Sequence, residues 1–505
     1  MSFWLWRGTR RFRYAGEVYN VDRIAFGKSL LLLCAWSVIV VWPVIYFATC
    51  CKIKAKNLSG GASRIAGSQI LVAYVPGVFL LFSSLHSGTL NPNLTMLTIL
   101  QLIAVLALGY LSAHFLIGKL QSKFFFASGI EYILLGVLIG PNATNLMTPD
   151  VVRQLNPFIS VSIGSLGLLY GLQLRIRDLA KVHTESYRLL FSEFLTTQIL
   201  VTGIFAIIFY QLFPNDKDNV GIFSGALVLG TSAAISAPTA IRAVRKRFKA
   251  KGPATDMLDF VIRFDQLLGI VFFGLIFCFY HIGQTHGIRA LTTTEWLAVN
   301  IGIGIVLGLL FYLFLGKEES ENKLLLGILG IVVFSSGAAY YLNLSPLFIN
   351  LILGVMLANT SKIHKKIIEV LHSVEKPFYA VILVFAGAAW NWDSYAERWP
   401  LMLQLVLFYL VIRYFGKLLG GQIAHTASEA PELLLRRIGT GLLSQGGVAV
   451  AMVVNYQQVY QNNYTAIVMT CVLISVVFYE WWSHYLTQKV LVDANEIESR
   501  ALTGK

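Results

Sequence analysis

Charged residues are scarce in this sequence of 505 residues: lysine, arginine, aspartate and glutamate make up 13% of it, about half the share found in ordinary water-soluble domains. Hydrophobic residues make up 56%. They fall into stretches of about twenty, the length that crosses about 30 Å of hydrocarbon as a helix. They do not follow the alternating pattern, about ten residues long, of a membrane barrel strand. The sequence therefore predicts an all-α polytopic membrane protein embedded in a lipid bilayer.

Cysteine and histidine are also few, with five cysteines and nine histidines scattered along the chain. No HExxH, CxxC or serine–histidine–aspartate spacing appears, and no second catalytic group accompanies any of the acids within the spans. We therefore expect no enzyme activity, no metal centre and no cofactor. The net charge of +14 does not indicate nucleic-acid binding, because the basic residues follow the membrane topology.

The apolar stretches predict about thirteen core transmembrane helices in two inverted six-helix repeats. Lysine and arginine gather in the loops after the odd-numbered spans, and such loops stay in the cytoplasm. We therefore expect the core to begin outside and the C-terminus to lie in the cytoplasm. The expected location is the plasma membrane. The core spans are expected near 94–117, 124–140, 157–174, 189–212, 220–241, 257–281, 296–315, 323–342, 345–358, 375–391, 400–424, 438–455 and 465–487.

One or two further membrane segments precede the core, near 28–49 and 67–84. Lysine and arginine flank the first of these on both sides, so it either spans the membrane or lies at its surface as a re-entrant piece.

Inverted repeats are typical of secondary transporters, whose site lies near the midplane where interrupted helices meet. The expected organisation is an N-terminal basic extension at 1–92, a first repeat at 93–285, a connecting helix at 286–322, a second repeat at 323–487 and a cytoplasmic tail at 488–505.

Two spans are interrupted by glycine, proline and small polar residues at the same place in each repeat. The fifth span of the first repeat contains Ser236 and Pro238, and its counterpart contains Ser444 and Gln445. Glycine costs about 1 kcal/mol and proline about 3 kcal/mol in a helix interior, so carbonyls and hydroxyls freed here can face an ion. Close helix packing through small residues is the alternative interpretation.

Ionisable residues inside the spans point to the same region, because each costs at least ~2.5–3.5 kcal/mol at the bilayer centre. The sixth span carries Asp265 and Gln266, and the eleventh carries Arg413 and Lys417. A buried carboxylate beside a buried cation suits a site that exchanges a proton for a metal cation. A purely structural salt bridge between the two halves is the alternative.

The cytoplasmic end of the sixth span carries a second charged pair. Asp259 and Arg263 are four residues apart on one helix face and are expected to form a structural ion pair, with Gln266 three residues further on that face. Asp265 is rotated by about 100° from Gln266 and points to a different neighbour.

Five stretches, in order, resemble the membrane domain of the monovalent cation:proton antiporters. They are GIEYILLGVLIGP, GSLGLLYGLQLRIRDL, SPLFINLILGVMLANT, EKPFYAVILVFAGAAW and GLLSQGGVAVAM, and the resemblance covers roughly residues 94–487. It is closest to the branch that includes the potassium-efflux antiporters. The resemblance implies a homodimer, a core half that moves against a dimerisation half, and exchange of Na⁺ or K⁺ for H⁺. The ion- and proton-binding residues that it implies are Asp265, Gln266, Ser236, Pro238, Ser444 and Gln445, with Arg413 or Lys417 compensating the charge.

The sequence departs from the family pattern at the acidic pair of the sixth span. In the family the second residue of the pair binds the ion, whereas here Asp265 comes first and Gln266 second. Ala237 also stands where many exchangers carry an acidic residue before the proline. Either Asp265 takes over after a small helix rotation, or proton coupling is altered or lost. The expected function is exchange of a monovalent cation for protons. The alternative is a membrane sensor, a scaffold or an uncoupled channel that has lost exchange.

Overall fold

The computed structural model describes residues 129–144, 147–179, 182–212, 219–282, 291–316, 318, 320–361, 363–390, 398–428 and 436–497. All regular secondary structure in these residues is helical. The predicted segments at 28–49, 67–84 and 94–117 and the last eight residues of the predicted tail lie outside the described residues. Each of the other predicted core spans coincides with a helix or with a helix pair. Eight of the described helices are long and apolar enough to cross a membrane.

The helices follow one another along the chain as α4 (Ile130–Ile139), α5 (Pro149–Leu172), α6 (Ile176–Leu179), α7 (Thr184–Leu212), α8 (Asn219–Ala234), α9 (Thr239–Phe248), α10 (Pro253–Phe279), α11 (Thr293–Leu315), α12 (Glu321–Tyr341), α13 (Pro346–Thr360), α14 (His364–Ala389), α15 (Trp399–Thr426), the 3₁₀ helix η3 (Ile438–Leu442), α16 (Gly447–Val459) and α17 (Thr465–Asp493).

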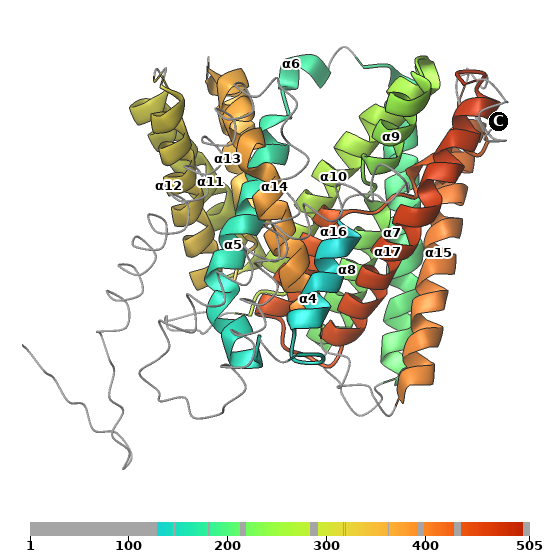
Figure 1. Ribbon diagram of the computed structural model, residues 1–505, viewed down its shortest axis with the longest axis horizontal. Coiled ribbons are helices and arrows are strands. Elements are labelled where there is room, and N and C mark those ends of the chain that lie inside the picture. Colours follow the sequence, from blue (N-terminus) through green and yellow to red (C-terminus); the bar gives the residue numbers. More distant parts are fainter. Residues whose placement is uncertain are drawn as a thin grey trace, which may run out of the picture. The chain divides into compact units, whose positions relative to one another are not determined.

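These helices pack into two groups (Figure 1). The first, here called the site group, contains α7, α8, α9, α10, α15, η3, α16 and α17. The second, here called the flanking group, contains α4, α5, α11, α12, α13 and α14. Contacts between the groups are made mainly by α10 and α16. The two helices that make most of these contacts thus also belong to the part of the molecule that carries the predicted site.

Glycines bring helices of the flanking group into backbone contact. A side chain at Gly167 of α5 would clash with the backbone of Leu347, and one at Gly354 of α13 would clash with the backbone of Leu168. Because helices in a membrane gain little from burying apolar surface, close van der Waals contact of this kind supplies much of their association energy. The flanking group is therefore closely packed where α5 crosses α13.

Between the two groups, glycine faces an aromatic ring at two places. Gly274 of α10 lies against the ring of Phe348 on α13, and Gly447 of α16 lies against the ring of Tyr379 on α14. The Gly447 N–H also donates a hydrogen bond of 2.8 Å to the Tyr379 hydroxyl. At both places a flat ring meets bare backbone rather than an interlocking side chain.

Side-chain hydrogen bonds between the groups gather at the end of the bundle opposite α9, where α14 and α16 end and α17 begins (Figure 1). Gln457 donates to the carbonyl of Ala389 at 2.9 Å, and the indole of Trp390 donates to the Thr470 hydroxyl at 2.9 Å. Gln458 donates to the carbonyl of Asn156 at 3.2 Å. The two groups are thus tied together at this end.

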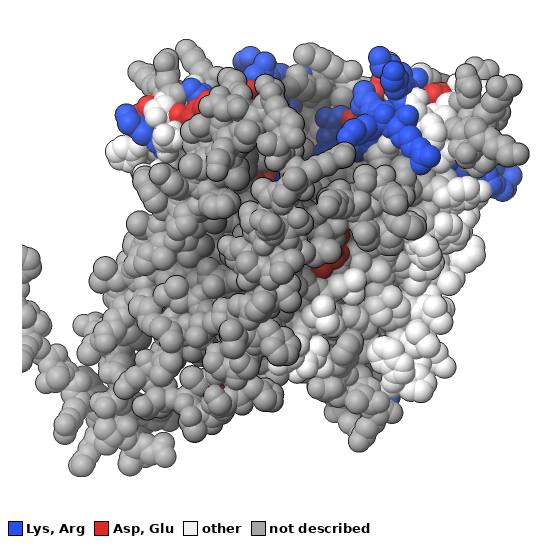
Figure 2. Space-filling view, in the orientation of Figure 1, with Lys and Arg blue, Asp and Glu red and all other residues white. Residues whose placement is uncertain are grey.

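Lysine and arginine gather at the other end, where α9 ends with Arg245, Lys246 and Arg247 (Figure 2). Asp259 and Arg263, the pair expected at the cytoplasmic end of the sixth span, form an ion pair here, and Arg245 lies 3.8 Å from the same carboxylate. The Arg263 side chain is 53% exposed, so the pair contributes at most about 1 kcal/mol. It belongs to the charged rim of the molecule and not to its buried site.

Candidate functional site

Both spans that were predicted to be interrupted are interrupted, and the two breaks lie side by side. One break separates α8 from α9 at residues 235–238, with Pro238 directly before α9. The other separates η3 from α16 at residues 443–446. The N–H of Ala237 donates a 2.8 Å hydrogen bond to the Ser444 carbonyl, and a side chain at Gly446 would lie 2.8 Å from the Ala237 methyl group. The missing side chain at Gly446 therefore lets the breaks meet.

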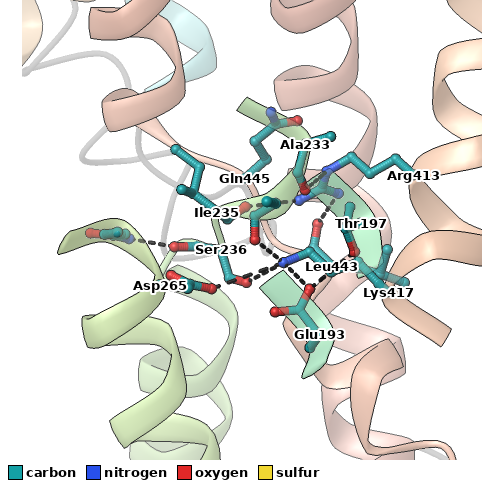
Figure 3. Close-up of polar contacts among 12 residues, drawn as sticks. Glu193, Thr197, Ala233, Ile235, Ser236, Asp265, Arg413, Lys417, Leu443 and Gln445 are labelled. Carbon is teal, nitrogen blue, oxygen red and sulfur yellow. Dashed lines mark hydrogen bonds and ion pairs between the residues drawn. The ribbon is translucent and has the colours of Figure 1, made fainter. Parts of the chain in front are cut away.

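The end of α8 and the break after it present five successive carbonyls, and each accepts a hydrogen bond from a side chain (Figure 3). A helix ends with unsatisfied carbonyls and a partial negative charge, so cationic and amide donors stabilise it. The acceptors and donors are Ser232 with Gln445 at 2.6 Å, Ala233 with Arg413 at 3.1 Å, Ala234 with Lys417, Ile235 with Arg413 at 3.2 Å, and Ser236 with Gln266.

Arg413 of α15 connects the two breaks and does not face Asp265. Besides the two carbonyls at the end of α8, its guanidinium donates to the Leu443 carbonyl at 2.7 Å. Its central carbon lies 4.5 Å from the centroid of the Tyr479 ring. Among the described residues it forms no ion pair with a carboxylate, although it is fully buried. Of the two candidates for charge compensation, Arg413 therefore acts as a cap on backbone carbonyls.

Lys417, one helical turn further along α15, lies between two buried acids (Figure 3). Its Nζ is 2.5 Å from Oε1 of Glu193 on α7 and 3.9 Å from Oδ2 of Asp265 on α10. It also donates to the Ser236 hydroxyl at 2.9 Å. All three charged side chains are fully buried, and neither oxygen of Asp265 accepts a hydrogen bond from the described residues.

Both glutamines donate their amide N–H to carbonyls at the end of α8 and in the break after it. Gln266 donates its amide N–H to the Ser236 carbonyl, next to Asp265 on the same helix. Gln445 donates to Ser232 and accepts a 2.6 Å hydrogen bond from the Ser475 hydroxyl of α17. Gln266 thus occupies the second position of the acidic pair as a hydrogen-bond donor to the break, a role that a carboxylate could not take.

Ser444 lies in a neighbouring cluster and not beside Asp265. Its hydroxyl is 2.7 Å from that of Thr239 and 3.3 Å from a carboxylate oxygen of Glu480 on α17. The predicted set therefore divides in two: Asp265, Gln266, Ser236, Gln445 and Lys417 converge at the end of α8, whereas Ser444 faces the start of α9.

Two buried acids, Glu193 and Glu480, were missed by the sequence analysis. Both had a signal, because each is the lone acid of its stretch, LLFSEFLTTQ for Glu193 and VVFYEWWSHY for Glu480, and neither stretch contains lysine or arginine. The rule that a charge within a span is costly, which identified Asp265, applies equally to them. What the sequence could not supply is the contact of Glu193 with Lys417, because α7 and α15 are more than two hundred residues apart.

The arrangement has a chemical consequence. Removing an ion from water costs several kcal/mol even after relaxation of the protein, and an unpaired buried charge is avoided. Of the two buried cations near these acids, Arg413 donates to backbone carbonyls, and Lys417 is the one within ion-pair distance of both Glu193 and Asp265. Asp265 is therefore the acid with the weaker direct compensation.

Comparison with known proteins gives the family and the fold. A family model described as the transmembrane sodium/hydrogen exchanger matches residues 103–482. No curated protein matches the sequence. The fold is similar to that of the sodium proton antiporter MjNhaP1 from Methanocaldococcus jannaschii at pH 8, with a TM-score of 0.58 and 18% identity over 78% of this chain and 99% of that one. A second structure of MjNhaP1, from electron microscopy, gives a TM-score of 0.53 and 18% identity over 78% and 98% of the chains.

Proposed function

Because the chain belongs to the sodium/hydrogen exchanger family, we propose that it exchanges a monovalent cation, Na⁺ or K⁺, for protons across a membrane. The observation that carries the proposal is the burial of Asp265 with little direct compensation of its charge. Its carboxylate is fully buried at the end of α8, accepts no hydrogen bond from the described residues, and shares one lysine with Glu193. It is therefore the group at which a proton and a metal cation compete.

In the proposed cycle Asp265 carries a proton or a cation in alternation. When Lys417 is held by Glu193, as here, Asp265 is free to take the additional positive charge. When Asp265 is empty, Lys417 moves the short distance to it and neutralises it. Lys417 therefore pairs with Glu193 while Asp265 is loaded and with Asp265 while it is empty. In both states the lysine compensates one buried negative charge.

The broken helices supply neutral ligands to the same site. Ser236 contributes a hydroxyl, and the carbonyls of residues 232–236 each accept one hydrogen bond but keep a second lone pair. Oxygen ligands of this kind suit hard cations such as Na⁺ and K⁺. A cation bound at Asp265 thus stays within reach of α8 without displacing its side-chain caps.

For the orientation in the membrane, we place the basic end at α9 in the cytoplasm, because basic segments are retained there. This puts the C-terminus in the cytoplasm as well, and we propose the plasma membrane and a homodimer, as the family resemblance implies. The site group, which carries every residue of the proposed mechanism, moves against the flanking group. The alternative of a sensor or channel that has lost exchange gains no support from the comparisons.

The test is cation-dependent proton movement in proteoliposomes that hold the purified protein and a pH-sensitive dye. The wild type is expected to dissipate an imposed pH gradient when Na⁺ or K⁺ is added, and Asp265→Asn is expected to abolish the response. Glu369→Gln, which removes an exposed acid of α14, is the matched control and should transport normally. Unchanged transport in Asp265→Asn would exclude Asp265 from the mechanism, and a silent wild type would exclude exchange of these ions.

A further inference from the structure

Glu480 of α17 is a third buried acid, and it lies outside the trio that contains Lys417. It is 5% exposed. Its Oε2 is 3.0 Å from the hydroxyl of Thr239 and 3.3 Å from that of Ser444, and these two hydroxyl oxygens are 2.7 Å apart. Thr239 begins α9 and Ser444 belongs to the break before α16. One carboxylate of α17 therefore contacts both interrupted helices.

The Glu480 Oε2 and the hydroxyl oxygens of Thr239 and Ser444 form a triangle, and the number of hydrogens available to it indicates whether Glu480 is protonated. Three oxygen–oxygen contacts of 2.7, 3.0 and 3.3 Å need three hydrogens if all are to be hydrogen bonds. Each hydroxyl supplies one hydrogen, and an ionised carboxylate supplies none because it is only an acceptor. A proton on Oε2 of Glu480 supplies the third and lets the three groups form a closed ring of hydrogen bonds.

The charges around Glu480 favour the same state. The groups that face it from the packed elements are the Thr239 and Ser444 hydroxyls, Tyr379 of α14 and Glu131 of α4, and none of these is a cation. On its own helix, the His484 ring lies 2.9 Å from the backbone oxygen of Glu480 and not from its carboxylate. No ion pair within the described residues includes Glu480. A buried carboxylate without a counter-ion is unfavourable, and binding a proton removes the charge.

A further buried oxygen on the same helix face has no partner. Oε1 of Glu480 accepts no hydrogen bond from the described residues, and neither does the hydroxyl of Ser483, which is three residues further along α17. Residues three apart on a helix share a face. The carboxyl group therefore has one oxygen engaged with the two breaks and one oxygen without a hydrogen-bond partner among the described residues.

We propose that Glu480, with the hydroxyls of Thr239 and Ser444, is a second proton-binding site, separate from Asp265 and placed on the α9 side of the breaks. The claim that Glu480 binds a proton is based on the contacts above. A role of this proton in transport rests on the proposed function. Loss of the proton leaves a carboxylate that accepts from both hydroxyls, so ionisation weakens the direct Thr239–Ser444 contact between the broken helices. The protonation state of Glu480 is thereby coupled to how the two breaks are held together.

Infrared spectroscopy of the purified full-length protein tests the proposal without any transport. A protonated carboxyl group has a carbonyl stretching band that an ionised one lacks. At neutral pH the wild type should show such a band, and Glu480→Gln should lose its Glu480 component. Glu369→Gln should leave the Glu480 component unchanged, because it replaces an exposed acid on another helix. A band of full intensity in Glu480→Gln would overturn the proposal.

A second variant keeps the acid and changes only its partner. Thr239→Val has nearly the same shape but removes one hydroxyl, so the band of Glu480 should shift to higher frequency as its hydrogen bonding weakens. Thr360→Val, at the exposed end of α13, is the matched control and should show no shift. An unshifted band in Thr239→Val would contradict the proposal even if Glu480→Gln failed to fold.

Transport measured on the same samples separates the two proposals. If the wild type moves no cation while the band depends on Glu480, the exchange function fails and the proton site stands. If the wild type exchanges cations while the band is independent of Glu480, the proton site fails and the exchange function stands.

Discussion

Lys417 lies closer to Glu193 than to Asp265: its ammonium nitrogen is 2.5 Å from the Glu193 carboxylate, within a fully buried pair that joins α15 to α7. The carboxylate of Asp265 lies 3.9 Å from the same nitrogen. Glu193 and Asp265 thus compete for one cation, and the structure captures the arrangement in which Glu193 holds it. The proposed mechanism makes this competition the means by which Asp265 becomes available to a transported ion.

Glu193→Gln is expected to weaken cation binding. An amide holds Lys417 less strongly than a carboxylate, so the lysine would move to Asp265 and compete with the transported cation. A coupling of about 1–3 kcal/mol corresponds to an increase in KM of roughly 5- to 150-fold. The measurement is KM for Na⁺ and for K⁺ in proteoliposomes, with Glu369→Gln as the control. An unchanged KM would show that Glu193 only anchors α7.

The order of the acidic pair can be exchanged. The double variant Asp265→Asn with Gln266→Asp restores the order that is usual in the family. In the wild type Gln266 donates a hydrogen bond to the Ser236 carbonyl, whereas the double variant places a carboxylate against that carbonyl. The double variant should therefore transport no better than Asp265→Asn alone. The same dye assay applies, and recovery of transport by the exchange would mean that position 266 is the ion-binding one.

Arg413→Lys is expected to lower stability although the charge is kept. The guanidinium donates to the carbonyls of Ala233, Ile235 and Leu443, and a lysine cannot reach all three. Each buried acceptor left without a donor costs about 1–3 kcal/mol. The melting temperature in detergent should fall, whereas Lys323→Arg, at an exposed position at the start of α12, should leave it unchanged. Equal melting temperatures would show that water replaces the lost donors.

The contact between the breaks can be tested by a double-mutant cycle. Gly446→Ala introduces a methyl group 2.8 Å from that of Ala237, and overpacking of this kind costs about 1–3 kcal/mol. Ala237→Gly should relieve the clash, so the double variant should be more stable than Gly446→Ala alone. Thermal unfolding of the four proteins gives the coupling. Additive effects would mean that the breaks separate to accommodate the methyl group.

His281 gives a pH dependence of stability at the end of α10. Burial lowers the pKa of its imidazole below its usual value, and the ring bonds to the Leu342 carbonyl at 2.8 Å. The folded state therefore favours the neutral ring. Its contribution is complete above the unfolded pKa of about 6.5 and is lost as the pH falls towards the folded value. The drop in melting temperature between neutral and acidic pH should be smaller in His281→Asn, and an equal drop would contradict this.

The sequence predicted the helices and the breaks because their signals are local. Span length, the position of Pro238 and the glycines before α16 depend only on neighbouring residues. The acid at Asp265 was found by the cost of its burial. Which cation faces it was not predictable, because Arg413 and Lys417 differ by one helical turn and only the position of the end of α8 decides between them. The role of Gln266 was not predictable either. Its place after the acid, reversed from the usual order of the pair, is explained only by its hydrogen bond to the Ser236 carbonyl.

Most of the side-chain hydrogen bonds between the two helix groups lie at the end opposite α9. The middle of the boundary holds flat rings against Gly274 and Gly447, with one hydrogen bond from the Gly447 N–H to the Tyr379 hydroxyl. Because the site group and the flanking group are hydrogen-bonded mainly at one end and otherwise meet through flat surfaces, rotation of one group about that end is favoured over sliding along the bundle. In the conformation described, the fulcrum is the pair of amides at Gln457 and Gln458.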